Sequence, residues 1–192
     1  MLHLFISRGA DAQHTLGVYD ACVNRNLPKL KVLLDAGYEV NHVFCATQAA
    51  KTCALMSAIE SDLCAAAKHP YTTSLSFTAL LLKAGADPNL IVASDTLREE
   101  RTPLASLLQS YLMNNTKPSA VYDLIDMLIS YGADPNLKYC VRNLIGDIEL
   151  NEQESVVSYT EKVYDRLVLM AESPTILNYI ICLGHTDDEV YF

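Results

Sequence analysis

The sequence lacks both a long apolar run and an N-terminal signal peptide. Its first apolar run, Leu2 to Ile6, is short, is interrupted by His3 and has no basic flank, whereas a secretory signal needs a basic segment before a longer apolar one. A membrane-spanning helix needs about 18 or more apolar residues in succession. We therefore expect a cytoplasmic protein that binds no membrane, or one that reaches a host cytosol by export without an N-terminal signal.

An excess of positive charge is also missing. The 192 residues include 14 lysines and arginines against 23 aspartates and glutamates, which gives a net charge of -9. This sign repels the phosphates of nucleic acids, so we expect no nucleic-acid partner and a mild preference for a basic one. With 51% hydrophobic and 19% charged residues, the composition is too apolar for a disordered chain.

No CxxC pair occurs among the six cysteines. Several cysteines lie in apolar helical patterns, where a free thiol behaves as a small hydrophobic side chain. This predicts free thiols in a reducing compartment rather than a disulfide framework. His42, Cys45 and Cys53 offer three metal ligands near one turn, but no fourth ligand completes a familiar zinc motif. We interpret His42 as a turn residue and expect no metal and no cofactor.

The familiar signatures of catalysis are absent as well. The sequence has no phosphate-binding loop that ends in Gly-Lys-Ser/Thr and no GxSxG. The runs Glu99–Glu100 and Asp187–Glu189 contain adjacent carboxylates, which are usually solvated in loops. A Cys–His pair would need contact between the two side chains and an oxyanion-binding element, and no spacing indicates one. We therefore expect no enzymatic activity, no catalytic residues and no cofactor-binding residues.

What the sequence does contain is an internal repeat. Residues 81–90 and 128–137 share the pattern Gly-Ala-Asp-Pro-Asn-Leu after an apolar run, and residues 33–41 and 5–11 are weaker copies. Each copy predicts a helix that ends at a Gly in the left-handed conformation. The Asp and Asn side chains favour a turn, and Pro88 and Pro135 prevent the helix from continuing.

Each of these helix ends should follow a second helix, packed antiparallel. Thr102 is predicted to be the N-cap and Pro103 the first helical residue of one such helix, before an apolar run that begins at Leu104. The segments 53–59, 18–21 and 163–166 occupy the equivalent place in the other units.

The combination of this helix start and this helix end resembles the ankyrin repeat. The best match is Val18 to Asn41, where Leu30, Leu33 and Leu34 lie on the second helix and the anchor precedes Gly37 by 19 positions. The resemblance implies an all-α fold: an ankyrin-like solenoid of antiparallel helix pairs with projecting turns, or fingers, and an irregular C-terminal helical cap.

The later units depart from the family spacing. The corresponding separation is 30 positions from Leu55 to Gly85 and 28 from Leu104 to Gly132. We place the insertions between the paired helices, around 64–74 and 113–119, where the composition is typical of loops. The histidine that the family usually carries after the proline is replaced in every unit.

The predicted domain organisation follows from these spacings. Residues 1–14 form a partial N-terminal repeat, and its missing first helix predicts that the chain is a piece of a longer protein. Residues 15–43 form an ankyrin-like repeat, and 44–90 and 91–137 form two more with inter-helix insertions. Residues 138–154 are interpreted as an acidic linker and 155–192 as a divergent C-terminal capping repeat; the alternative for the last segment is a small appended helical module.

The resemblance implies a function in protein–protein interaction, because stacked helix pairs leave a concave face and fingers for a partner. We expect a monomer that binds another protein. The alternative is that the segment recruits a substrate or a host target for a larger enzyme or pathogen effector. An extended charged finger between Leu90 and Arg101 is a plausible recognition element, although such a charge cluster is more often simply solvated. Tyr19 is interpreted as a packing residue. The partner-binding candidates carried over by position are Thr52, Glu60, Ser61, Ile91, Asp95, Arg98, Glu99, Arg101, Gln109 and Ser110.

Overall fold

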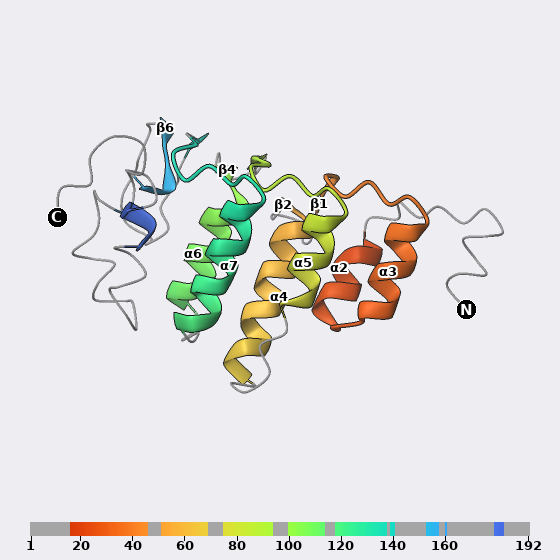
Figure 1. Ribbon diagram of the computed structural model, residues 1–192. Coiled ribbons are helices and arrows are strands. Elements are labelled where there is room, and N and C mark those ends of the chain that lie inside the picture. The colour runs from red at the N-terminus through yellow and green to blue at the C-terminus, as the bar shows by residue number, and fades with distance from the viewer. Residues whose placement is uncertain are drawn as a thin grey trace.

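The computed structural model is mostly helical and is arranged as a row of helix pairs (Figure 1). It describes residues 16–45, 51–68, 75–93, 100–113, 118–137, 139–140, 153–157, 160 and 179–182. The partial repeat expected at residues 1–14 lies outside these ranges. Within them, no helix is both long and apolar enough to cross a membrane.

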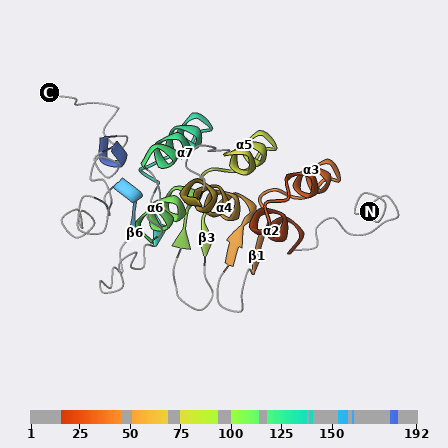
Figure 2. The same cartoon turned by 90° about the horizontal axis from the view of Figure 1, so that it is seen from below.

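Within the described residues, three antiparallel pairs form the row. They are α2 (Leu16–Val23) with α3 (Leu27–Asp35), α4 (Ala54–Lys68) with α5 (Ser76–Lys83), and α6 (Pro103–Met113) with α7 (Pro118–Ser130). Helices α2, α4 and α6 also contact one another in sequence order. Figure 2 shows the result as two layers, an inner layer of α2, α4 and α6 on the side of the strands and an outer layer of α3, α5 and α7.

Short antiparallel strand pairs project from one edge of the row (Figure 1). They are β1 (Val43–Cys45) with β2 (Lys51–Cys53), β3 (Val92–Ala93) with β4 (Glu100–Arg101), and β5 (Tyr139–Cys140) with β6 (Gln153–Glu154). The expected fingers are therefore β-hairpins at their bases. The third pair lies at the two ends of the segment 138–154, which the sequence predicts to be an acidic linker. The pairing of β5 with β6 holds these two ends together, as in the other fingers.

The helix ends are built as the repeated glycines predict. Gly37, Gly85 and Gly132 have φ of 84°, 91° and 91°. After Gly85, the N–H of Ala86 bonds the carbonyl of Leu81 at 3.0 Å and the N–H of Gly85 bonds that of Leu82 at 3.1 Å. The same two bonds recur around Gly37 and Gly132. This pair of bonds is the Schellman motif, which satisfies the last carbonyls of a helix.

Side chains also cap the helix starts. The Thr102 hydroxyl accepts a hydrogen bond from the N–H of Ala105 at 3.2 Å, which confirms Thr102 as the cap before Pro103. Asn26 plays this part for α3, since its side-chain oxygen accepts from the N–H of Lys29 at 3.0 Å. Such caps satisfy amide groups that have no partner within the helix.

The first insertion differs in part from its predicted loop. Its first half, 64–68, continues α4 to Lys68, and residues 69–74 lie outside the described ranges. The apolar spacing explains the extension, because Leu63 and Ala66 continue the buried face of α4. In the second insertion, α6 ends at Met113 and α7 begins at Pro118.

Asparagine side chains join successive units. The Asn41 side-chain oxygen accepts from the N–H of Asp87 at 2.7 Å, and its amide donates to the carbonyl of Gly85 at 3.3 Å. Asn89 makes the equivalent bonds to Asp134 and Gly132, both at 2.7 Å. Each unit thus holds the turn of the next one in the same way.

One apolar core runs through all three pairs and includes Val156, Val157 and Ile180 from the C-terminal part. Tyr179 packs edge-on against Tyr122 of α7, with ring centroids 5.2 Å apart, and its hydroxyl bonds Asp126. The described residues of the predicted cap, 155–157, 160 and 179–182, therefore include several that pack against the last helix pair.

Candidate functional site

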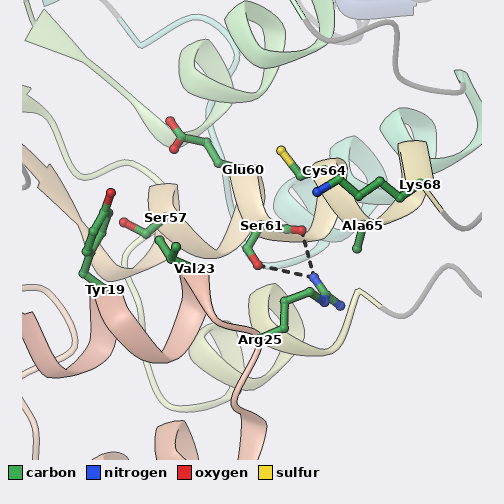
Figure 3. Close-up of a pocket in the computed structure, with 9 residues that line it drawn as sticks. All are labelled: Tyr19, Val23, Arg25, Ser57, Glu60, Ser61, Cys64, Ala65 and Lys68. Carbon is green, nitrogen blue, oxygen red and sulfur yellow. Dashed lines mark hydrogen bonds between the residues drawn. The ribbon is translucent and has the colours of Figure 1, made fainter.

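The inner layer carries a hollow of about 500 Å³ between α2 and α4. Figure 3 shows its lining residues, which come from α2, from the turn that follows it and from one side of α4. Tyr19, Ser57 and Glu60 lie toward one end of the view, and Cys64, Ala65 and Lys68 toward the other. The complete lining is Tyr19, Val23, Arg25, Ser57, Glu60, Ser61, Cys64, Ala65 and Lys68.

Arg25 fixes the floor of this hollow by joining two units. It has a φ of 50°, in the left-handed region, and from there its guanidinium reaches α4. It donates to the carbonyl of Ser61 at 2.8 Å and pairs with Asp62 at 3.2 Å. The guanidinium also lies 5.0 Å from the ring centroid of Phe77, within the range of a cation–π contact. Because these groups hold the guanidinium in place, Arg25 is a fixed part of the lining of the hollow.

The partner of Arg25 is a buried carboxylate. Asp62 is 1% exposed and accepts hydrogen bonds from both the N–H and the hydroxyl of Thr78 at 2.9 Å. Burial raises the pKa of Asp62, although the bonds from Thr78 and the charge of Arg25 act in the opposite direction. The Arg25–Asp62–Thr78 chain therefore connects α2, α4 and α5 beneath the hollow.

Glu60 supplies the negative charge at one end of the hollow. Its side chain is exposed, but the surrounding protein partly removes it from water and raises the pKa of its carboxyl. The charge of Arg101, at the base of the second finger, lowers that pKa by a smaller amount. Glu60 is thus a carboxylate whose hydration is incomplete and which would gain from a cationic partner.

The same end of the hollow is apolar and aromatic. Val23 is 56% exposed and is one of the few large hydrophobic side chains in the described residues that are not at least partly buried. Tyr19 is held by an edge-on contact with Phe44 of the first finger, with centroids 6.2 Å apart and planes at 70°. The interpretation of Tyr19 as a packing residue is therefore confirmed for one side of its ring, while the residue also lines the hollow.

The structure brings together some of the predicted contact residues. Glu60 and Ser61 both line the hollow. Ser61 also donates to the carbonyl of Cys22 at 2.6 Å, so it holds the neighbouring unit. Thr52 and Arg101 lie half-buried in the strands of the first and second fingers.

The remaining candidates are spread more widely. Gln109 accepts a hydrogen bond from Arg101 at 3.4 Å, and Ile91 is 38% exposed just before β3. Ser110 departs from the expected contact surface because it is only 8% exposed; α6 is buried around its whole circumference from Leu104 to Leu108. Asp95, Arg98 and Glu99 lie outside the described residues.

Sequence reasoning missed Val23, Arg25 and Lys68 as parts of this surface. Arg25 follows the first helix, and nothing local reveals that it reaches Ser61 in the next unit. The sequence predicts a loop insertion at Lys68, but this residue is the last of α4. Val23 is the last residue of α2, and its exposure is not visible from the sequence.

The cysteines do not form a metal centre in the described part of the chain. No group of three or more His, Cys, Asp and Glu side chains there could hold a metal ion. Cys22, Cys45, Cys53, Cys64 and Cys182 are free thiols. Burial raises the pKa of Cys22 to about 12 and that of Cys53 to about 11, so these two thiols remain protonated and behave as core residues.

Comparison with known proteins gives no assignment: no protein-family model matches the sequence, and no curated protein matches it with significant similarity.

Proposed function

We propose that this chain is an ankyrin-like solenoid that binds another protein through its inner layer and the bases of its fingers, without catalysing a reaction. The observation that carries the proposal is the hollow between α2 and α4, which is lined by the exposed residues Val23 and Glu60 and by the half-buried Tyr19. Protein interfaces typically combine apolar and aromatic side chains at their centre with a polar rim.

The ankyrin-like class is supported by the equivalence of the units. The glycine-terminated helices, the hairpin bases and the asparagine bonds recur in the same order along the chain. Units of this kind complete each other's cores only by stacking. Such stacking leaves the inner layer as an extended surface, and surfaces of this shape suit protein partners better than small molecules.

Several properties favour a cytoplasmic, monomeric binding module. Cys45 and Cys64 are exposed free thiols, and exposed free thiols suit a reducing compartment. The net charge of -9 disfavours self-association and favours a partner that carries positive charge.

The proposal can be tested by blocking the hollow. Val23→Lys with Cys64→Lys places two long cationic side chains in it, at positions that are exposed and therefore tolerate them. The matched control, Ser119→Lys with Tyr131→Lys, adds the same charge at exposed positions of the outer layer and the turn after it. Proteins captured from a cytosolic extract are quantified by mass spectrometry for both variants and the wild type.

We expect the inner-layer variant to capture at least about thirtyfold less of each specific partner. This is the loss of affinity that follows when an interface loses an anchor residue worth about 2 kcal/mol. The outer-layer variant should retain them, and both should keep the thermal unfolding temperature of the wild type. Equal capture by the two variants would show that the inner layer is not the binding surface.

A further inference from the structure

We infer that the hollow between α2 and α4 receives an arginine side chain of the partner protein, with the guanidinium at Glu60. This inference rests on the proposed function and specifies the chemistry of the same site. It depends on three features of the hollow: one carboxylate that can take a cation, apolar and aromatic lining residues, and a lysine two turns further along α4.

Among the charged lining residues, Glu60 is the place where a cation can bind. Three lining residues are charged: Glu60, Arg25 and Lys68. Arg25 is already held by Asp62 and Ser61, so its charge is largely balanced. Glu60 is the lining carboxylate, and Arg101 outside the hollow is the cation whose charge acts on it. A partner cation at Glu60 would therefore meet negative charge in a partly desolvated place, where attraction is stronger than in bulk water.

The wall beside Glu60 selects a side chain with an apolar stem. Val23 is 56% exposed, and the Tyr19 ring is fixed by Phe44. An aliphatic stem that covers Val23 removes apolar surface from water, and a cation over the face of a tyrosine ring gains a further attraction. Arginine and lysine both offer such a stem and a charged end.

Arginine fits better than lysine for two reasons. Its planar guanidinium stacks on an aromatic ring, and it can donate two parallel hydrogen bonds to one carboxylate. It is also less strongly hydrated than an ammonium group, so it loses less on entering a hollow.

Lys68 sets the direction in which the partner binds. It lies eight positions after Glu60 on α4, so the two backbone positions are about 12 Å apart along the helix axis, and Figure 3 shows its side chain turned back toward Cys64. A cationic side chain inserted the other way would meet Lys68, and such a repulsive element contributes to specificity. Acidic groups of the partner are accordingly expected near Lys68.

The test uses short peptides as probes. Acetyl-Ala-Ala-Arg-Ala-Ala-amide is titrated into the full chain labelled with nitrogen-15, and amide shifts are followed by NMR. Peptides with citrulline or lysine in place of arginine are titrated in parallel. Citrulline keeps the shape of arginine and lacks its charge. We expect saturable shifts in α2 and α4 with the arginine peptide, and affinities at least about fivefold weaker for the two others.

Two variants separate Glu60 from general electrostatics. Glu60→Gln should weaken binding of the arginine peptide at least about fivefold. Asp123→Asn removes one exposed carboxylate from the outer helix α7 and should leave the affinity for this peptide unchanged. Both are surface changes and should keep the wild-type unfolding temperature. Equal binding of the arginine and citrulline peptides, tighter binding of the lysine peptide, or unchanged binding by Glu60→Gln would overturn the inference.

The failure of this inference can be distinguished from failure of the proposed function. If partner capture is lost in the Val23→Lys, Cys64→Lys variant but persists in Glu60→Gln, the binding surface is correct and the arginine assignment is wrong. If the blocked hollow still captures the same partners, both ideas fail together.

Discussion

Asn41 and Asp87 are joined by a 2.7 Å hydrogen bond, in which the backbone N–H of Asp87 donates to the side-chain oxygen of Asn41. The bond connects the turn after α3 to the turn after α5. Asn89 and Asp134 repeat it at 2.7 Å one unit later. Two identical bonds between successive turns require that the units stack with the same displacement, which is the geometric basis of the continuous inner layer.

The asparagine bonds are expected to stabilise the stack. Asn89→Ala removes the bonds to Asp134 and Gly132, and since one hydrogen bond contributes about 0.5–1.5 kcal/mol net, the free energy of unfolding should fall by about 1–3 kcal/mol. Urea denaturation measures this change. Asn24→Ala removes an exposed bond within a single unit and should cost less than about 0.5 kcal/mol. Equal effects of the two changes would refute the bridging role.

The glycine at each helix end is needed for its backbone conformation and for no other reason. Gly85 has a φ of 91°, and a Cβ added there would meet no atom within 4 Å. Gly85→Ala should therefore destabilise the fold by about 1–2 kcal/mol through backbone strain alone. Gly85→Asn should cost less, because asparagine adopts left-handed conformations more readily. Thermal denaturation of the two variants gives the comparison, and an alanine variant as stable as the wild type would rule out the strain.

Asp62 should make stability depend on pH. Its pKa is raised in the folded protein. At pH values between the ordinary pKa of a carboxyl group and this higher pKa, the folded state therefore keeps a proton that the unfolded state has released. The free energy of unfolding should therefore fall as the pH rises through that window. Asp62→Asn should flatten this part of the profile, whereas Asp123→Asn should not. A profile that instead rises with pH through the window would mean that the pairing with Arg25 outweighs burial.

Tyr38 offers a route to higher stability. It stands where the other units have Ala86 and Ala133, and it is buried. Its hydroxyl has no hydrogen-bond partner in the described structure, and burial raises its pKa to about 12. Tyr38→Phe keeps the ring and removes the buried hydroxyl, so we expect about 1 kcal/mol of added stability. Tyr38→Ala should cost about 3–5 kcal/mol by leaving a cavity. A destabilised phenylalanine variant would reveal a partner for the hydroxyl.

Local features of the fold could be predicted from the sequence. Gly37, Gly85 and Gly132 end helices because their neighbours in the chain supply the carbonyls and amides of the motif. Thr102 caps the helix that starts at Pro103 for the same reason. These features depend on residues within about five positions of each other, so a repeated pattern is enough to identify them.

The site could be predicted only in part, because it depends on contacts between units. Glu60 and Ser61 were identified from their place in the repeat, but the hollow exists because Arg25 crosses to Ser61 and Asp62. Likewise, Ser110 occupies an equivalent repeat position and yet is buried. Which side of an inner helix stays open is decided by the neighbouring units, and no local pattern records it.

The most direct test of the central claim, that the inner layer binds a protein, is site-specific photo-crosslinking. A photoreactive amino acid is placed at Val23 or Cys64, which line the hollow, and separately at Lys83 or Asp123, which are exposed on outer helices. We predict that both inner positions crosslink to the same protein in cytosolic extract and that neither outer position does. Crosslinking of that protein with equal yield from inner and outer positions, or from the outer positions alone, would contradict the claim.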